Sequence, residues 1–217
     1  MKKFLLLTIT LTSAVLFSRA QITKGTILLG GGFNVGSSKN YYGSVNTSES
    51  KSTNLIIGPS IGLAVKDNSV VGVKLQYGHT FNSNTATTTS SDKNYSYLTG
   101  IYFRRYMILG KGFYLFGEAD ANYSTSKKSY TYPTNENKDV TQQGGISLSP
   151  GIAYTVSKRM HLEISMNDLF NIGFTHINYE STYSGIVTES KMDSFGANTN
   201  FNTGSALSVG FRFAIGK

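Results

Sequence analysis

Apolar and polar residues alternate with a period of two in eight segments of this chain. In segment 146–156, for example, an apolar or aromatic residue stands at every second position, with Gly, Ser, Ala and Thr between. Successive side chains of a β-strand point to opposite faces, so this pattern predicts strands with one apolar face and one small or polar face. The predicted strands are 26–36, 54–66, 71–81, 95–106, 113–123, 146–156, 161–174 and 206–217.

Three of these segments contain an irregularity. In segment 161–174 the alternation loses phase near Asp168, which predicts a β-bulge or the end of the apolar zone. Pro59 and Pro150 stand at matching positions in two other segments, each six residues before a valine that precedes a short turn. Proline has no N–H to donate to a neighbouring strand. We therefore predict that each proline marks a bulge or bend that helps to close a small barrel.

The connections between the segments alternate between long and short. KDNS, ILGKG and SKRM are short, whereas the others are long and rich in Ser, Thr, Asn and Tyr, the longest running from about 175 to 203. Strands of about ten residues in even number, joined alternately by short turns and long loops, are typical of outer-membrane barrels. The pattern predicts an all-β fold, an eight-stranded antiparallel up-and-down transmembrane β-barrel with long outer loops.

The first twenty residues predict export rather than a part of the fold. Two lysines precede an apolar run, and small residues stand at Ser18 and Ala20, as in a signal peptide cleaved near Ala20. We expect 1–20 to be a signal peptide and 21–217 to be one barrel domain in the outer membrane of a Gram-negative bacterium. The chain has no cysteine, which excludes disulfides and a lipid anchor on cysteine.

The residues of the non-apolar face predict that this face is inside the barrel. A soluble lipocalin-like barrel, the alternative, needs a charged outer face. Only 15% of the residues in this chain are charged, and the non-apolar face is mostly Gly, Ser and Ala, which suit the crowded interior of eight strands. The apolar face carries aromatic residues near strand ends, as at membrane interfaces. We therefore predict that the apolar face contacts lipid.

Six charged residues fall on the predicted inner face. Three are basic and three are acidic: Lys74, Arg104, Arg212, Glu118, Asp120 and Glu163. Isolated buried charges are costly, so we expect these side chains to pair in a structural polar network that plugs the barrel. The alternative is a charged pore lining or a proton path, but eight strands leave little interior space for one.

The sequence shows no recognisable catalytic or metal-ligating pattern. No spacing links one of the three histidines with a nucleophile and an acid, and no His/Cys cluster is present. We expect no catalytic residue, no cofactor and no metal, with a lipid-modifying enzyme at the barrel rim as the remaining enzymatic alternative. The basic residues are scattered along the chain, so no nucleic-acid partner is expected.

Three segments resemble a known family. GPSIGLAVKDNSVVGVKLQYG has a proline, a short Asp/Asn turn and a glycine-containing strand, and SPGIAYTVSKRMHLEISM is a looser second copy. Both resemble the signature of the Bacteroidetes outer-membrane β-barrel domain family, including small eight-stranded barrels of the OmpX or OmpW type. SVGFRFAIGK resembles the last strand by which such barrels are recognised for assembly. The resemblance implies the fold, the outer membrane and the barrel assembly machinery as a partner, but no catalytic residues.

The sequence therefore predicts a structural or surface-contact protein. Lipid would surround the barrel, and the loops, rich in Tyr and small polar residues, would contact an extracellular partner. The alternative is a channel or passage for small, possibly apolar, molecules across the outer membrane.

Overall fold

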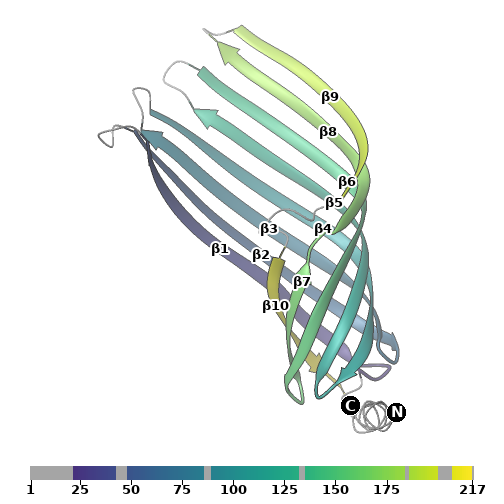
Figure 1. Cartoon of the computed structure of the whole chain (residues 1–217). Coiled ribbons are helices and arrows are strands. Elements are labelled where there is room, and N and C mark those ends of the chain that lie inside the picture. The colour runs from purple at the N-terminus through teal and green to yellow at the C-terminus, as the bar shows by residue number, and fades with distance from the viewer. Residues whose placement is uncertain are drawn as a thin grey trace, which may run out of the picture.

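The computed structural model describes residues 22–42, 48–85, 89–131, 135–183, 186–199 and 207–216. The predicted signal peptide lies outside the described residues. Those that are described form one antiparallel sheet of ten labelled strands (Figure 1). No helix among them is long and apolar enough to cross a membrane.

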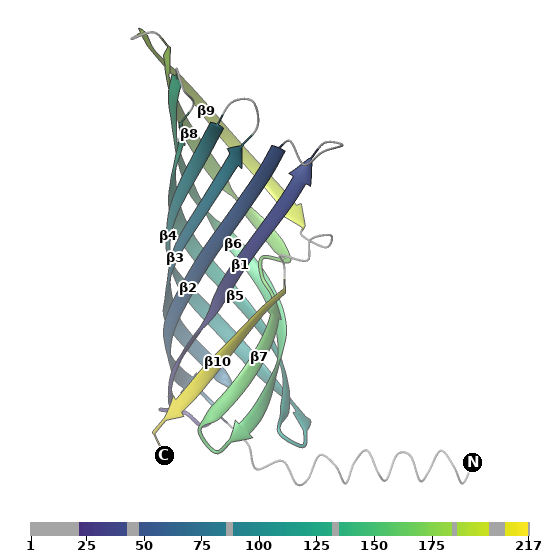
Figure 2. The same ribbon diagram turned by 90° about the vertical axis from the view of Figure 1, so that its left-hand side faces the viewer.

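The strands close into a barrel in up-and-down order. They are β1 (Ile27–Tyr42), β2 (Ser48–Lys66), β3 (Ser69–Thr85), β4 (Thr89–Gly110), β5 (Phe113–Thr131), β6 (Asn135–Ser157), β7 (Met160–Met166), β8 (Phe170–Tyr183), β9 (Ile186–Thr199) and β10 (Leu207–Ile215). Each of β1 to β6 pairs with the next, β6 pairs with β7, and β10 pairs with both β7 and β1. These eight strands form a closed ring (Figure 2), so the predicted fold is confirmed.

The two ends of the barrel differ. We call the end with the short connections 66–69, 110–113 and 157–160 the turn end, and the opposite end the rim. The positive φ angles of Asn68 (58°) and Lys111 (52°) mark two of these tight turns. The N-terminal segment is fixed at this end, because the backbone N–H of Asn68 donates to the carbonyl of Ile22 at 2.8 Å.

The seventh strand of the wall is interrupted where the alternation loses phase. β7 pairs with the last part of β6, and β8 pairs with its first part. Asp168 lies between β7 and β8 with a φ of 50°, a left-handed conformation that is uncommon for residues other than glycine. Its backbone N–H donates to Ser149 Oγ at 3.0 Å. The alternation therefore loses phase at a break between two strands, not at a β-bulge.

The strand pairing shows no bulge at Pro59, where the sequence predicts a bulge or bend. In the β2–β3 pairing the register is the same on both sides of Pro59, and between Ile57 and Ser60 only Gly58 and Pro59 are left unpaired. In an antiparallel ladder, the pairing of residues 58 and 59 with the next strand depends on a hydrogen bond from the N–H of residue 59, which proline lacks. The missing donor of Pro59 therefore removes a local hydrogen bond without shifting the strand.

The bulge predicted at Pro150 is also absent from its own strand. Pro150 pairs in unbroken register with Gly117 of β5. On its other side β6 pairs with β8 as far as Leu148 and with β7 from Gly151 onward. Pro150 thus faces the break between β7 and β8, where the ladder is already interrupted, and its missing N–H costs little there.

The prediction of long outer loops is wrong as well. β4 and β6 are 22 and 23 residues long, roughly twice the ~9–11 residues that cross a bilayer. The region 175–203 holds most of β8 and all of β9, which pair with each other. The rim halves of the strands carry polar residues on both faces, so the sequence shows no alternation there. Pairing with neighbouring strands nevertheless extends the strands to this length.

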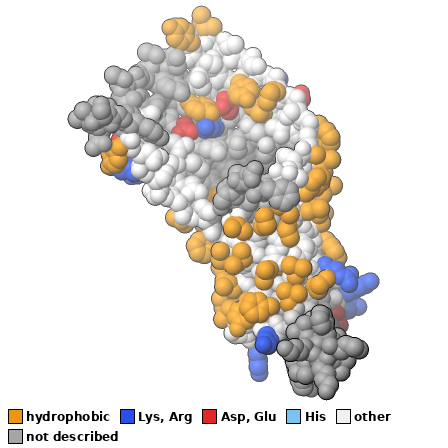
Figure 3. Space-filling view, in the orientation of Figure 1, with side chains coloured by type: hydrophobic (Ala, Val, Ile, Leu, Met, Phe, Trp, Pro, Cys, Tyr) orange, Lys and Arg blue, Asp and Glu red, His pale blue; other side chains and the backbone are white. Residues whose placement is uncertain are grey.

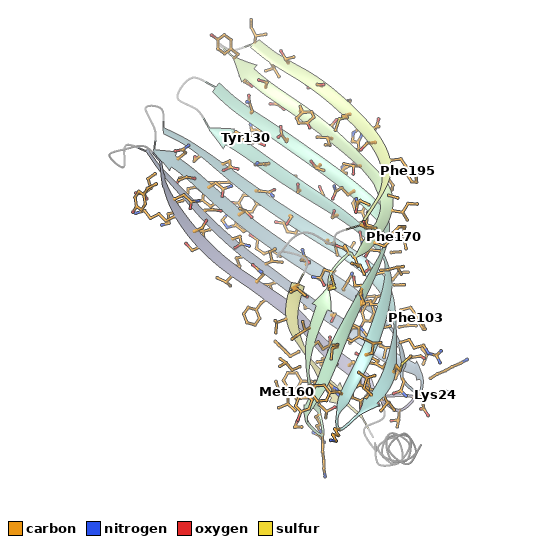
Figure 4. All side chains as sticks on the ribbon, viewed as in Figure 1. Lys24, Phe103, Tyr130, Met160, Phe170 and Phe195 are labelled. Carbon is orange, nitrogen blue, oxygen red and sulfur yellow. The ribbon has the colours of Figure 1, made fainter. Side chains whose placement is uncertain are left out.

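The apolar stripes face outward, as predicted. Leu63, Ile152 and Val209 are 48%, 50% and 55% exposed, whereas alternate residues such as Ala64 and Ala153 are buried. Hydrophobic side chains gather over the lower part of the molecule, at and above the turn end (Figure 3). Phe103 and Phe170 lie on the outer side of the wall (Figure 4).

The wall has a lateral opening toward the rim. β1 pairs with β10 only from Ile27 to Gly32, and beyond Gly32 the structure pairs β1 with β2 alone. β9 pairs with β8 alone. In the described part of the chain, β1 and β9 are therefore not joined, and the gap between them faces the viewer in Figure 1.

Candidate functional site

The six charged residues predicted for the inner face lie in the closed part of the barrel and form one network. They come from five strands: Lys74 from β3, Arg104 from β4, Glu118 and Asp120 from β5, Glu163 from β7 and Arg212 from β10. Each stands at an inward position of its strand, and all except Lys74 are buried. The strand register brings these residues together, although they are spread over about two thirds of the sequence.

Glu163 is the centre of the network. Its carboxylate accepts hydrogen bonds from Arg104 Nη1 at 2.7 Å, from Arg212 Nε at 3.0 Å and from the Tyr106 hydroxyl at 3.1 Å. Hydrogen bonds between charged groups are strong, and a low dielectric increases their strength. Glu163 therefore ties β4, β7 and β10 together across the interior.

The carboxylates of Glu118 and Asp120 pair with Arg104 and Lys74. Arg104 Nε and Nη2 both contact Glu118 Oε2, at 2.8 Å and 2.7 Å. Lys74 Nζ lies 2.8 Å from Asp120 and 3.7 Å from Glu118. Asp120 also accepts hydrogen bonds from Ser147 at 2.8 Å and from Asn122 at 2.6 Å. Each acid is thus engaged by at least one cation.

Aromatic side chains surround the two arginines. The Tyr102 hydroxyl accepts a hydrogen bond from Arg212 Nη1 at 2.9 Å, and the Arg104 guanidinium lies 4.0 Å from the centroid of the Phe116 ring, a cation–π geometry. The sequence analysis missed these aromatic partners. Tyr102 and Tyr106 are each two residues from Arg104 and therefore lie on the same face of β4. This spacing could have identified them as inward-facing.

An apolar cluster lies between the network and the turn end. It consists of fully buried side chains: Leu28, Ala64, Val70, Tyr102, Tyr106, Tyr114, Phe116 and Ala153, with Ile22 of the N-terminal segment. Tyr106 belongs to both groups, because its ring packs against Tyr114 and Phe116 while its hydroxyl binds Glu163.

A cavity of about 340 Å³ lies on the rim side of the network. Every charged member of the network except Asp120 lines it. Phe33 of β1 and Leu207 of β10 also line it, next to the point where these two strands separate. The cavity therefore extends from the charged network to the lateral opening.

A smaller polar cluster lies near the rim. Asp92 accepts a hydrogen bond from Asn82 at 3.1 Å and pairs with Lys128 at 3.3 Å. The side-chain hydrogen bond with Tyr130 is the largest cause that raises the pKa of Lys128 above its usual value, and Asp92 adds to it. Because these groups are partly exposed, their contribution to stability is small.

Each of the three histidines has an aromatic or acidic neighbour of its own. His79 stacks on Tyr95 with the ring centroids 4.7 Å apart, and His161 packs against the edge of Tyr114. His176 pairs with Asp193 on the neighbouring strand. Within the described residues, no three His, Cys, Asp or Glu side chains come together as metal ligands would.

A closed eight-stranded barrel with an apolar outer band and a polar interior is the architecture of an outer-membrane β-barrel. The solved structure of the outer membrane protein OprG from Pseudomonas aeruginosa is similar to this chain, with a TM-score of 0.52 and 11% sequence identity. The match covers 90% of this chain and 98% of that one. At this identity the likeness shows the fold.

Two further solved structures are more distant. A major outer membrane protein from Thermus thermophilus has a TM-score of 0.43 and 12% identity, with 87% of this chain and 99% of that chain covered. The translocator domain of the autotransporter NalP from Neisseria meningitidis has a TM-score of 0.36 and 11% identity, with 96% and 93% covered. No family model and no curated protein matches the sequence, so the resemblance to the Bacteroidetes family stays a prediction.

Proposed function

We propose that this chain is an outer-membrane barrel protein with a plugged interior and a structural or surface-contact function. The observation that carries the proposal is the charge-balanced network centred on Glu163, with the apolar cluster next to it. An ion moving along the barrel axis would have to separate buried ion pairs and then pass a layer of buried aromatic side chains. Both steps are costly in a low-dielectric interior.

The outer surface supports a location in the membrane with one end beyond it. The half-exposed apolar side chains around the turn end would contact lipid acyl chains. The long strands carry the rim beyond the bilayer, and their Tyr, Asn, Ser and Thr residues would form the contact surface for an extracellular partner. β10, which closes the ring, would be the strand that the barrel assembly machinery recognises.

A passage for small, possibly apolar, molecules is the second candidate function. The cavity above the network reaches Phe33 and Leu207 at the lateral opening, and both side chains are more than half exposed. A molecule that entered from the rim would leave sideways into the membrane rather than along the plugged axis. Uptake of an apolar dye by liposomes that contain the protein, without ion conductance, would favour this candidate.

Surface labelling tests the location and orientation. The chain has no native cysteine, so Glu189→Cys near the rim and Lys158→Cys at a turn can be compared directly. With a membrane-impermeant maleimide on intact cells, we expect Glu189→Cys to be labelled and Lys158→Cys to be labelled only after the outer membrane is disrupted. Equal labelling of both variants in intact cells would contradict the proposed orientation.

A further inference from the structure

A second cavity, of about 450 Å³, lies in the inner wall of the rim half. Strands β5, β6, β8 and β9 supply most of its lining, and none of the six charged network residues lines it. It shares Leu98, Asn122 and Asp168 with the cavity beside the network. Its volume falls within the ~300–1,000 Å³ of typical small-molecule sites. The cavity lies on the rim side of the network, where a ligand from outside the cell would arrive first if the rim faces outward.

The lining is polar but almost uncharged. It contains four side-chain amides and several hydroxyls, and it has no Lys, Arg or His. The amides belong to Asn122, Gln143, Asn171 and Asn198, and the single charge is Asp168. An anionic ligand would find no cation here, and an apolar ligand would desolvate the amides without replacing their hydrogen bonds. An uncharged ligand with many hydroxyl groups fits this lining.

Two of the amides are available for a ligand. Asn122 donates to Asp120, and Gln143 donates weakly to Thr175 at 3.4 Å. Asn171 and Asn198 stand directly opposite each other on β8 and β9, and neither makes a side-chain hydrogen bond with the other described residues. Each amide offers two donors and an acceptor, and a sugar hydroxyl can both accept and donate.

Gly196 provides room beside these amides. It lies on the same side of β9 as Asn198, two residues away, and a Cβ built on it meets no atom of the described residues within 4 Å. A side chain at this position would therefore occupy the cavity without disturbing its neighbours. The open space next to the amide pair is where a hydroxyl-bearing ring would lie.

We propose that this cavity binds a neutral saccharide, with Asn171 and Asn198 holding its hydroxyl groups and the ring lying over Gly196. The ligand class follows from an amide-rich lining that has one carboxylate and no cation, and from a free amide pair. Binding does not depend on whether the barrel axis is plugged, so this proposal and the proposed function can fail independently.

Titration of the whole refolded protein with neutral trisaccharides tests the proposal. The detergent should be an amine oxide, because a maltoside head group would compete for the site. We expect at least one of maltotriose, cellotriose and chitotriose to bind by isothermal titration calorimetry and citrate not to bind. Gly196→Trp, which fills the cavity, should weaken saccharide binding at least about tenfold.

Two further variants separate a site effect from a folding effect. The double variant Asn171→Ala with Asn198→Ala removes the amides without adding bulk, and it should also weaken binding. Ala197→Trp makes a comparable insertion at the adjacent position of the same strand, which does not line the cavity, and should bind like the parent. Absence of binding by all three trisaccharides, undiminished binding to Gly196→Trp, or citrate binding that Gly196→Trp abolishes would overturn the proposal.

Discussion

Replacing Glu163 with glutamine is expected to lower the free energy of unfolding by about 3–5 kcal/mol. Glu163 is the shared partner of Arg104 and Arg212, at 2.7 Å and 3.0 Å, and all three side chains are buried. Glutamine keeps the shape but removes the charge, so two buried guanidinium groups are left to share Glu118. Urea titration of the protein refolded in lipid vesicles measures this loss.

A matched control uses the same substitution at an exposed ion pair. Glu49 pairs with Lys39 at 3.0 Å, and the two side chains are 36% and 48% exposed. Solvent screens such pairs, so Glu49→Gln should change the free energy of unfolding by less than ~1 kcal/mol. Adding Arg212→Leu to Glu163→Gln should recover part of the loss, because Arg104 then no longer shares Glu118 with Arg212. Equal effects of the two Glu→Gln variants would contradict the network's role.

Arginine at Ile152 is expected to destabilise the barrel by ~2–4 kcal/mol in lipid. Ile152 is half exposed in the apolar band of β6, opposite Leu115 and Ile164 on the adjacent strands. A guanidinium there must be moved from water into acyl chains. The measurement is again a urea titration in vesicles.

The control is a more exposed isoleucine outside the apolar band. Ile186 begins β9 near the rim and is 69% exposed, so Ile186→Arg should cost little if the rim lies in water. Gly151→Ala, one residue from Ile152 but on the inner face, should destabilise for a different reason. Its Cβ would come within 2.3 Å of the Phe116 ring and overfill the interior. Equal tolerance of arginine at Ile152 and Ile186 would argue against a lipid-facing band.

Alternation predicts the closed part of the barrel well because each strand there has one lipid-facing and one inward side. The alternation of apolar and polar positions alone places Arg104 and Glu163 on the inner face. Their opposite charges then predict that they pair. Alternation cannot predict which atoms meet. Glu163 and Arg212 are 49 residues apart, and only the register of β7 against β10 brings them together.

The rim half could not be predicted in the same way, because both faces of its strands are polar. The saccharide cavity illustrates this limit. Asn171 belongs to a predicted strand, but Asn198 falls in a segment that the sequence predicts to be a loop. Their adjacency depends on the pairing of β8 with β9. Pro150 shows a related limit of sequence-based prediction. The proline predicts an irregularity in β6, but the structure has the interruption in the neighbouring strand, between β7 and β8.

Single-molecule conductance in a planar bilayer tests the plugged interior most directly. A larger porin, whose wide barrel leaves an aqueous channel, serves as the positive control in the same membrane. The parent protein is predicted to insert without a stable ion current, because the ion pairs around Glu163 and the aromatic layer beside them obstruct the axis. A steady current through single inserted molecules of the parent protein would contradict this prediction.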